Sequence, residues 1–211
     1  MRLVRDDAAM VAASDMRVSL VGESGTGKTV LARWMHERSP RSQHPFEYFL
    51  CGGAEPTLVR GELFGRVKGA YTGASDDCPG CLERTHGGSV LLDEIADLCA
   101  EGQGALPHFL DGHGLKRLGG RRPLCPDVRI FTASKVPLAE LVGAGRLRED
   151  LRWRLEHWTL VLPPLRLAGA EPRTRRRLVR DPGGPARGRP RGTARQAHLH
   201  RIEGPVVRDH R

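Results

Sequence analysis

Residues 22–29 have the types and spacing of a phosphate-binding loop. A glycine is followed by four free positions and then Gly-Lys-Thr. In such a loop, backbone N–H groups surround phosphate oxygens, the lysine reaches the β- and γ-phosphates, and the threonine hydroxyl binds Mg²⁺. The alternative, a chance glycine-rich turn, is disfavoured because an apolar run precedes the loop and an amphipathic run follows it. The residues predicted to bind a nucleotide here are Gly22, Glu23, Ser24, Gly25, Thr26, Gly27, Lys28 and Thr29.

Two adjacent carboxylates, Asp93 and Glu94, end the apolar run 90–92. In an open α/β sheet, ligands bind at the carboxyl ends of the strands. Next to a phosphate loop, Asp93 can hold Mg²⁺, and Glu94 can orient and deprotonate an attacking water. The alternative is an acidic pair at the start of the next helix, and it would be preferred if there were no phosphate loop. The pair therefore favours nucleotide hydrolysis over binding alone.

Short apolar strands alternate with helical patterns along the chain, which predicts a mainly parallel sheet covered by helices. Three glycines within 65–74 predict an exposed, mobile loop. Helices are expected from the phosphate loop to about Pro40, and over Thr57–Phe64, Gln103–Leu110, Pro137–Val142 and Leu147–Leu155. The expected strands are Arg17–Val21, Phe46–Cys51, Ser89–Asp93, Val128–Ala133 and Thr159–Leu162.

Charge divides the 211 residues into two parts. Twelve arginines and four acidic residues lie in 167–211, so this segment carries +8 of the net charge of +9 and leaves +1 for 1–166. We predict one α/β domain over 1–166 and an Arg-, Pro- and Gly-rich tail over 167–211 that is disordered. No apolar run reaches the length of a membrane span, and the N-terminus lacks the apolar stretch of a secretory signal, so a cytoplasmic protein is expected.

Residues 8–166 resemble the AAA+ domain of bacterial sigma-54-dependent transcription activators, the enhancer-binding proteins. The resemblance rests on the phosphate loop and on further motifs spread through the domain. These motifs are Gly61–Gly65, Gly69–Ala74, Gly87-Gly88 with Leu92–Ile95, Asp127–Ile130, Gly145–Leu151 and Leu162–Arg166. The family implies a three-layer P-loop NTPase that binds ATP and Mg²⁺ and hydrolyses ATP.

The most diagnostic motif, Gly-Ala-Tyr-Thr-Gly-Ala at 69–74, differs from the family's Gly-Ala-Phe-Thr-Gly-Ala by one hydroxyl. The resemblance implies that nucleotide state moves this loop, which engages sigma-54 on RNA polymerase holoenzyme and remodels the closed promoter complex. Tyr71 and Thr72 would form the contacting tip, with Tyr71 exposed to solvent. The residues implied to bind this partner are Gly69, Ala70, Tyr71, Thr72, Gly73 and Ala74.

Arg148 and Arg154 match the family's arginine fingers, which reach the γ-phosphate bound by a neighbouring subunit. The resemblance therefore implies a homo-oligomeric, hexamer-like ring in which catalysis needs a guanidinium supplied in trans. From spacing alone, solvated helix arginines would be the preferred interpretation of both residues. Ser134 matches the position that senses the γ-phosphate.

The sequence departs from the family at three places. Leu50 stands where an Asn usually restrains the catalytic Glu, and Lys135 stands where an Asn commonly ends the sensor strand. After Arg166 the expected helical lid is replaced by the Arg-rich tail, either as a nucleic-acid-binding segment or, as we prefer, through a frame shift or truncation. We expect no sequence-specific DNA-binding domain in the chain.

These observations predict an ATP-binding AAA+ module that hydrolyses ATP if it can oligomerise and that acts on sigma-54 RNA polymerase. Two alternatives remain open. The chain could bind ATP without hydrolysing it and act as an adaptor or inactive subunit, or it could bind nucleic acid non-specifically through its tail.

Overall fold

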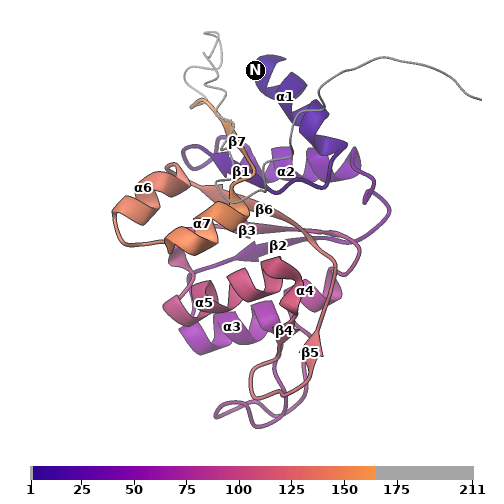
Figure 1. Ribbon diagram of the computed structural model, residues 1–211, viewed down its shortest axis with the longest axis vertical. Coiled ribbons are helices and arrows are strands. Elements are labelled where there is room, and N and C mark those ends of the chain that lie inside the picture. Colours follow the sequence, from indigo (N-terminus) through magenta and orange to yellow (C-terminus); the bar gives the residue numbers. More distant parts are fainter. Residues whose placement is uncertain (1, 165–211) are drawn as a thin grey trace, which may run out of the picture. The chain divides into compact units, whose positions relative to one another are not determined.

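Five strands form one parallel sheet with the order β2-β3-β6-β1-β7 (Figure 1). The computed structural model describes residues 2–164, with side chains placed from residue 4. Every predicted strand is present, and its ends lie within one residue of their predicted positions. The strands are β1 (Val18–Val21), β2 (Phe46–Leu50), β3 (Ser89–Asp93), β6 (Arg129–Ser134) and β7 (Trp158–Val161).

Helices cover both faces of the sheet and bury a separate apolar core on each (Figure 1). α1 and α2 pack on one face against β1 and β7, while α3, α5, α6 and α7 pack on the other face against β3 and β6. This arrangement confirms the predicted three-layer α/β fold. The helices are α1 (Arg2–Ala12), α2 (Lys28–Glu37), α3 (Pro56–Phe64), α4 (Cys81–Arg84), α5 (Ala100–His108), α6 (Leu138–Gly143) and α7 (Glu149–Leu155).

The order of the strands determines which predicted site residues lie close together. β6 lies between β3 and β1, with Asp93 beside Ala133 and Val21 beside Ser134. The carboxyl ends of these strands therefore bring the acidic pair and the phosphate loop to one edge of the sheet, as the sequence predicted.

Helix α1 was not predicted, although its apolar positions have helical spacing. Val4, Ala8, Val11 and Ala12 are buried against the sheet layer. Arg129, 2% exposed at the start of β6, anchors the end of this helix. Its guanidinium donates to the backbone oxygens of Val11 (2.8 Å), Ala12 (2.9 Å) and Met16 (3.1 Å).

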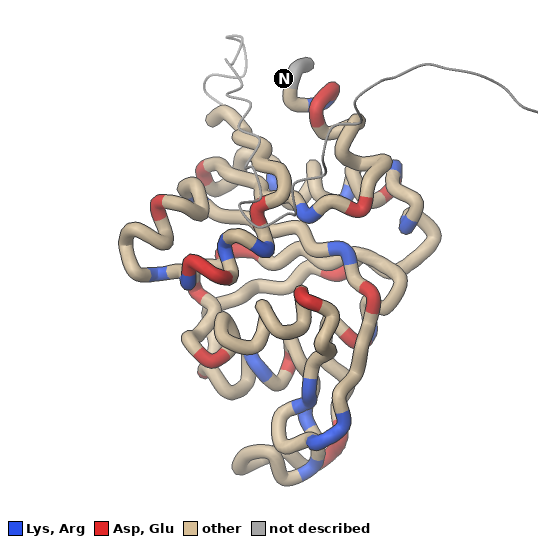
Figure 2. The backbone as a smooth tube through the Cα atoms, viewed as in Figure 1, with Lys and Arg blue, Asp and Glu red and all other residues tan. Residues whose placement is uncertain are grey.

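A hairpin formed by β4 (Leu115–Lys116) and β5 (Pro123–Leu124) was also not predicted. It lies beside the root of the loop 65–74, where the Val67 N–H donates to the Leu118 oxygen at 3.0 Å. Figure 2 shows Lys and Arg gathered in this part of the molecule. Lys116, Arg121 and Arg122 are exposed there.

The predicted tail, 167–211, lies outside the described residues, so its predicted disorder and the domain boundary near Arg166 stay predictions. Within the described part of the chain, no helix has both the length and the apolar character needed to cross a membrane.

Candidate active site

The phosphate loop connects β1 to the first turn of α2. Gly25 and Gly27 adopt φ angles of 80° and 90°, which disfavour residues with a β-carbon, and α2 begins at Lys28. The Lys28 ammonium is largely buried and donates to the backbone oxygens of Gly22 (2.7 Å) and Glu23 (3.1 Å). The loop thus places a cation and a helix N-terminus together, which suits a phosphate group.

Gly22 has no room for a side chain. A β-carbon there would lie 2.9 Å from both the Leu162 backbone oxygen and the Thr26 hydroxyl oxygen. The Gly22 N–H donates to the Ser134 backbone oxygen at 3.0 Å, which ties the loop to the end of β6. The Ser134 hydroxyl itself donates to the Val136 oxygen at 2.7 Å.

Asp93 is held by two hydrogen bonds at the end of β3. One carboxylate oxygen accepts the Glu94 N–H at 3.0 Å, and the other accepts the Tyr48 hydroxyl at 2.9 Å. Partial burial is the larger cause, and the hydrogen bond to Asp93 the smaller cause, of a rise in the pKa of Tyr48 to about 12. The phenol therefore stays protonated and remains a donor. Sequence reasoning missed Tyr48, because only the register of β2 against β3 reveals that its hydroxyl can reach Asp93.

Glu94 has a left-handed backbone (φ 51°), the one positive φ outside glycine among the described residues. Such a conformation is uncommon for a residue with a β-carbon and is often found at functional sites. Its carboxylate lies 3.3 Å from the Lys135 ammonium. Leu50 is 46% exposed and, as expected, has no polar group with which to hold Glu94.

Thr29 and Asp93 fit a Mg²⁺ ion bound together with a nucleotide. Mg²⁺ is usually held by one or two protein oxygens together with phosphate oxygens and water. Asp93 is fixed by its two hydrogen bonds at the sheet edge, and Thr29 is exposed in the first turn of α2. Among the side chains at this edge, these two would hold the ion.

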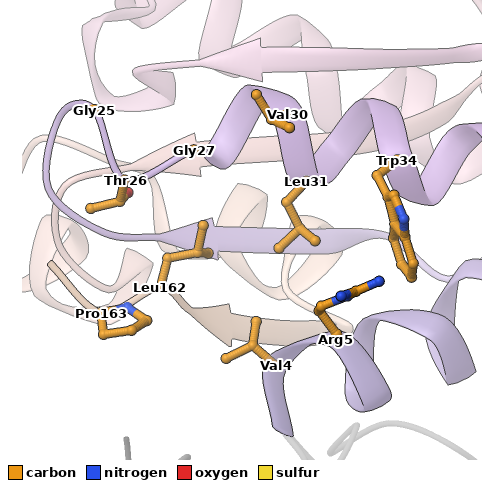
Figure 3. Close-up of a pocket in the computed structure, with 10 residues that line it drawn as sticks. All are labelled: Val4, Arg5, Gly25, Thr26, Gly27, Val30, Leu31, Trp34, Leu162 and Pro163. Atoms are coloured by element: carbon orange, nitrogen blue, oxygen red, sulfur yellow. The ribbon is translucent and has the colours of Figure 1, made fainter. Parts of the chain in front are cut away.

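An apolar cavity of about 420 Å³ adjoins the phosphate loop (Figure 3). α1 contributes Val4 and Arg5 to its wall, and α2 contributes Trp34. A flat aromatic group of the size of a nucleobase matches such a cavity. The full lining is Val4, Arg5, Gly25, Thr26, Gly27, Val30, Leu31, Trp34, Leu162 and Pro163.

Arg148 and Arg154 lie at the two ends of α7, and each is paired with a carboxylate of its own chain. Arg148 binds Asp150 through two hydrogen bonds of 2.9 and 3.1 Å. Arg154 binds Asp111 with a shortest distance of 2.8 Å and also donates to the Asp150 backbone oxygen at 2.7 Å. The guanidinium groups lower the pKa values of both carboxyls, which keeps these pairs ionised. Their predicted role in a neighbouring subunit stays a prediction.

A backbone hydrogen bond and a buried alanine close the base of the loop 69–74. The Gly69 N–H donates to the Ala74 oxygen at 2.8 Å, and Ala74 is buried. The expectation of a solvent-exposed Tyr71 is wrong: this ring is half-buried, and a β-carbon at Gly61 of α3 would lie 3.5 Å from it. Thr72 and Gly73 form the exposed tip.

Three features define a P-loop nucleoside-triphosphatase fold. They are a parallel sheet, a phosphate loop at a helix N-terminus, and an acidic pair at the end of β3, which is separated from β1 by one strand. The family model for the sigma-54 interaction domain matches residues 1–161. The chain therefore belongs to the sigma-54-dependent activator family of AAA+ domains, as the sequence motifs indicated.

Individual relatives agree with this family. The response regulator PilR of Pseudomonas aeruginosa is 40% identical over 166 residues, which cover 79% of this chain and 37% of PilR. The anaerobic nitric oxide reductase transcription regulator NorR of Escherichia fergusonii is 41% identical over 169 residues, covering 80% of this chain and 34% of NorR. The chain thus spans about a third of the length of these relatives.

The fold is similar to that of a crystal structure of NtrX from Brucella abortus in complex with ATP. The two superpose with a TM-score of 0.69 at 32% identity, over 78% of this chain and 37% of the NtrX chain. An E. coli P-loop NTPase domain of a sigma-54 activator shares the fold with a TM-score of 0.53 at 19% identity, over 78% of this chain and 94% of that one.

Proposed function

We propose that this chain binds ATP with Mg²⁺ and hydrolyses it to ADP and phosphate. The observation that carries this proposal is the meeting of the phosphate loop with Asp93 and Glu94 at one edge of the sheet. Membership of a family whose relatives are transcription regulators supports a role for the proposed activity in the control of transcription.

Each side chain has a distinct task in the proposed reaction. Lys28 binds the β- and γ-phosphates, and the N–H groups of residues 25–28 surround them. Thr29 and Asp93 hold the Mg²⁺ ion, which neutralises charge on the phosphates when bound. Glu94 accepts a proton from the water that attacks the γ-phosphorus. Tyr48 keeps the Asp93 carboxylate oriented through its hydrogen bond.

The apolar cavity beside the loop supplies the binding surface for the base. Its position between α1 and α2 leaves the phosphate loop at one end of the cavity, so one nucleotide spans both (Figure 3). The crystal structure of NtrX with ATP supports a nucleotide in this fold.

We propose further that hydrolysis takes place between subunits of a ring. Arg148 and Arg154 match the family's trans-acting arginines, and both lie on or next to the short helix α7. Within the chain, the two guanidinium groups pair with the carboxylates of Asp150 and Asp111. An arginine supplied by a neighbour can raise turnover by about 10³–10⁵-fold.

The proposed output of hydrolysis is a movement of the loop 69–74 against sigma-54 bound to RNA polymerase. The exposed Thr72 and Gly73 would make the first contact, and Tyr71 would leave its position beside α3 to add apolar area. Because the chain spans about a third of its relatives, this output is proposed for the domain as part of a larger assembly.

One observation favours a second candidate function, ATP binding without turnover. The Lys135 ammonium pairs with the proposed general base, Glu94. A carboxylate that stays paired is a weaker proton acceptor in the reaction. Such a chain would act as an adaptor or inactive subunit.

ATP hydrolysis measured against protein concentration separates the two candidates. The full 211-residue chain is compared with Glu94→Ala and Arg148→Ala. A specific activity that rises with concentration and is lost in both variants supports the proposed ATPase. ATP binding with no turnover at any concentration would support the second candidate instead.

A further inference from the structure

Arg17 contacts the end of α7, the helix that carries the proposed trans-acting arginine Arg154. Arg154 lies in the last turn of this seven-residue helix. The carbonyl groups of a last helical turn have no partner within the helix, and a cation beside them is favourable. One nitrogen of the Arg17 guanidinium donates to the Arg154 backbone oxygen at 2.9 Å. Arg17 therefore caps the helix at the residue whose side chain would act in the neighbouring subunit.

The second contact of Arg17 is with the segment that binds the Arg154 side chain. The other terminal nitrogen of Arg17 donates to the Leu110 backbone oxygen at 2.7 Å. The next residue, Asp111, accepts from the Arg154 Nε, which lies 2.8 and 2.9 Å from the two carboxylate oxygens. One guanidinium thus joins the backbone of Arg154 to the backbone next to its carboxylate partner.

The backbone of Arg17 belongs to a well-packed part of the sheet. It directly precedes β1, which is buried along its whole length and pairs with β6 on one side and β7 on the other. The Arg17 backbone oxygen accepts the Trp158 N–H of β7 at 3.2 Å. The phosphate loop follows the opposite end of β1, and at about 3.3 Å per residue Gly22 is about 16 Å from Arg17. Arg17 therefore lies beside α7 and away from the nucleotide site of its own chain.

We propose that Arg17 is a positioning residue for Arg154, which keeps this arginine where the nucleotide site of the neighbouring subunit can receive it. The proposal rests on the proposed ring ATPase and adds to it a residue that acts on the neighbour's site. Replacing Arg17 leaves Arg154 in the chain but removes both bonds that join it to the start of β1. Turnover should then fall while ATP binding is kept, because the phosphate loop, Asp93 and Glu94 are unchanged.

ATP turnover and ATP binding are measured on the full 211-residue chain and on Arg17→Met, with Arg38→Met as the control. Arg38 is an exposed arginine after α2 that also donates to a backbone oxygen, that of Trp34 at 3.4 Å. Arg17→Met should lower kcat by about three- to tenfold with the dissociation constant for ATP unchanged. Arg17→Lys keeps the charge but has one nitrogen for two oxygens, so its kcat should lie between those of the parent and Arg17→Met. A parent-like kcat for either variant, or an equal loss in Arg38→Met, would overturn the proposal.

Mixtures of variants separate a displaced Arg154 from damage to the variant's own site. An equal mixture of Arg17→Met with Glu94→Gln, which has its arginines but no base, should regain about a quarter of the parent turnover. A mixture with Arg154→Ala should regain none, because neither chain supplies a correctly placed arginine. The opposite pattern, recovery with Arg154→Ala and none with Glu94→Gln, would overturn the proposal and leave the ring ATPase standing.

Two further results complete the test. If Arg17→Met loses cooperative thermal unfolding, Arg17→Lys takes its place in the same mixtures and should give the same pattern. The double variant Arg17→Met/Arg154→Ala should lose no more turnover than Arg154→Ala alone, since both changes act on one arginine, and additive losses would contradict this. An Arg154→Ala chain with the parent turnover would overturn the shared site itself, and with it the role of Arg17.

Discussion

Replacing Arg129 by Met should destabilise the domain more than any exposed arginine change, because Arg129 fastens α1 to the sheet. The change removes three donors from backbone oxygens, two of them in fully buried bonds. At about 1 kcal/mol for each bond, the loss is about 3 kcal/mol. Burial lowers the pKa of Arg129 only to about 10, so its guanidinium is charged at neutral pH.

Thermal unfolding followed by circular dichroism measures this loss. For a domain of this size, 3 kcal/mol corresponds to a fall in melting temperature of roughly 6–12 °C. Arg129→Lys keeps the charge but has one nitrogen for three oxygens, so it should fall between the parent and Arg129→Met. Arg38→Met is the control, because this side chain is 51% exposed and should change the melting temperature little.

ATP binding provides a second measurement of the effect of Arg129→Met. α1 supplies Val4 and Arg5 to the cavity beside the phosphate loop, so a loosened α1 should also weaken ATP binding. A melting temperature for Arg129→Met within about 1 °C of the parent, with unchanged ATP affinity, would refute the view that Arg129 anchors α1.

Three further changes test single contacts. Gly22→Ala places a methyl group against the two oxygens described above and should reduce ATP affinity in calorimetry by at least about tenfold; unchanged affinity would contradict the packing. Tyr48→Phe removes the bond to Asp93 and should lower kcat about three- to tenfold with the melting temperature unchanged, whereas equal kcat would show that the bond is dispensable. Arg154 lowers the pKa of Asp111 from its usual value of 3.8. The stability that this ion pair contributes is therefore fully present above pH 3.8 and is lost as the pH falls through the lowered pKa. Asp111→Asn should therefore cost less than about 1 kcal/mol at neutral pH and progressively less as the pH falls below 3.8, and a cost that does not change with pH would contradict the ion pair.

The strands and the phosphate loop could be predicted because their signals are local. Each strand is a short apolar run, and the parallel order follows from alternation with helices. The meeting of Lys28 with Asp93 at one edge then follows from the direction of parallel strands. The structure confirms this part of the fold.

The contacts that refine the site could not be read from the sequence. The Tyr48–Asp93 bond depends on strand register, and the Lys135–Glu94 pair depends on which strand lies between two others. Helix α1 has buried positions at helical spacing. Charged residues among its first positions made this apolar pattern difficult to recognise from the sequence. Tyr71 was expected at an exposed tip because glycines flank it, yet its ring packs near α3, a long-range contact that composition does not encode.

The most direct test of an ATPase site shared between subunits is to mix two inactive variants. Glu94→Gln keeps its arginines but lacks the base, and Arg154→Ala keeps the base but lacks an arginine. In head-to-tail rings assembled from equal amounts of the two variants, about a quarter of the interfaces join an intact base to an intact arginine. The mixture should therefore regain about a quarter of the ATP turnover of the parent chain. A mixture as inactive as its two components, or an Arg154→Ala chain that hydrolyses ATP at the parent rate, would contradict a shared site.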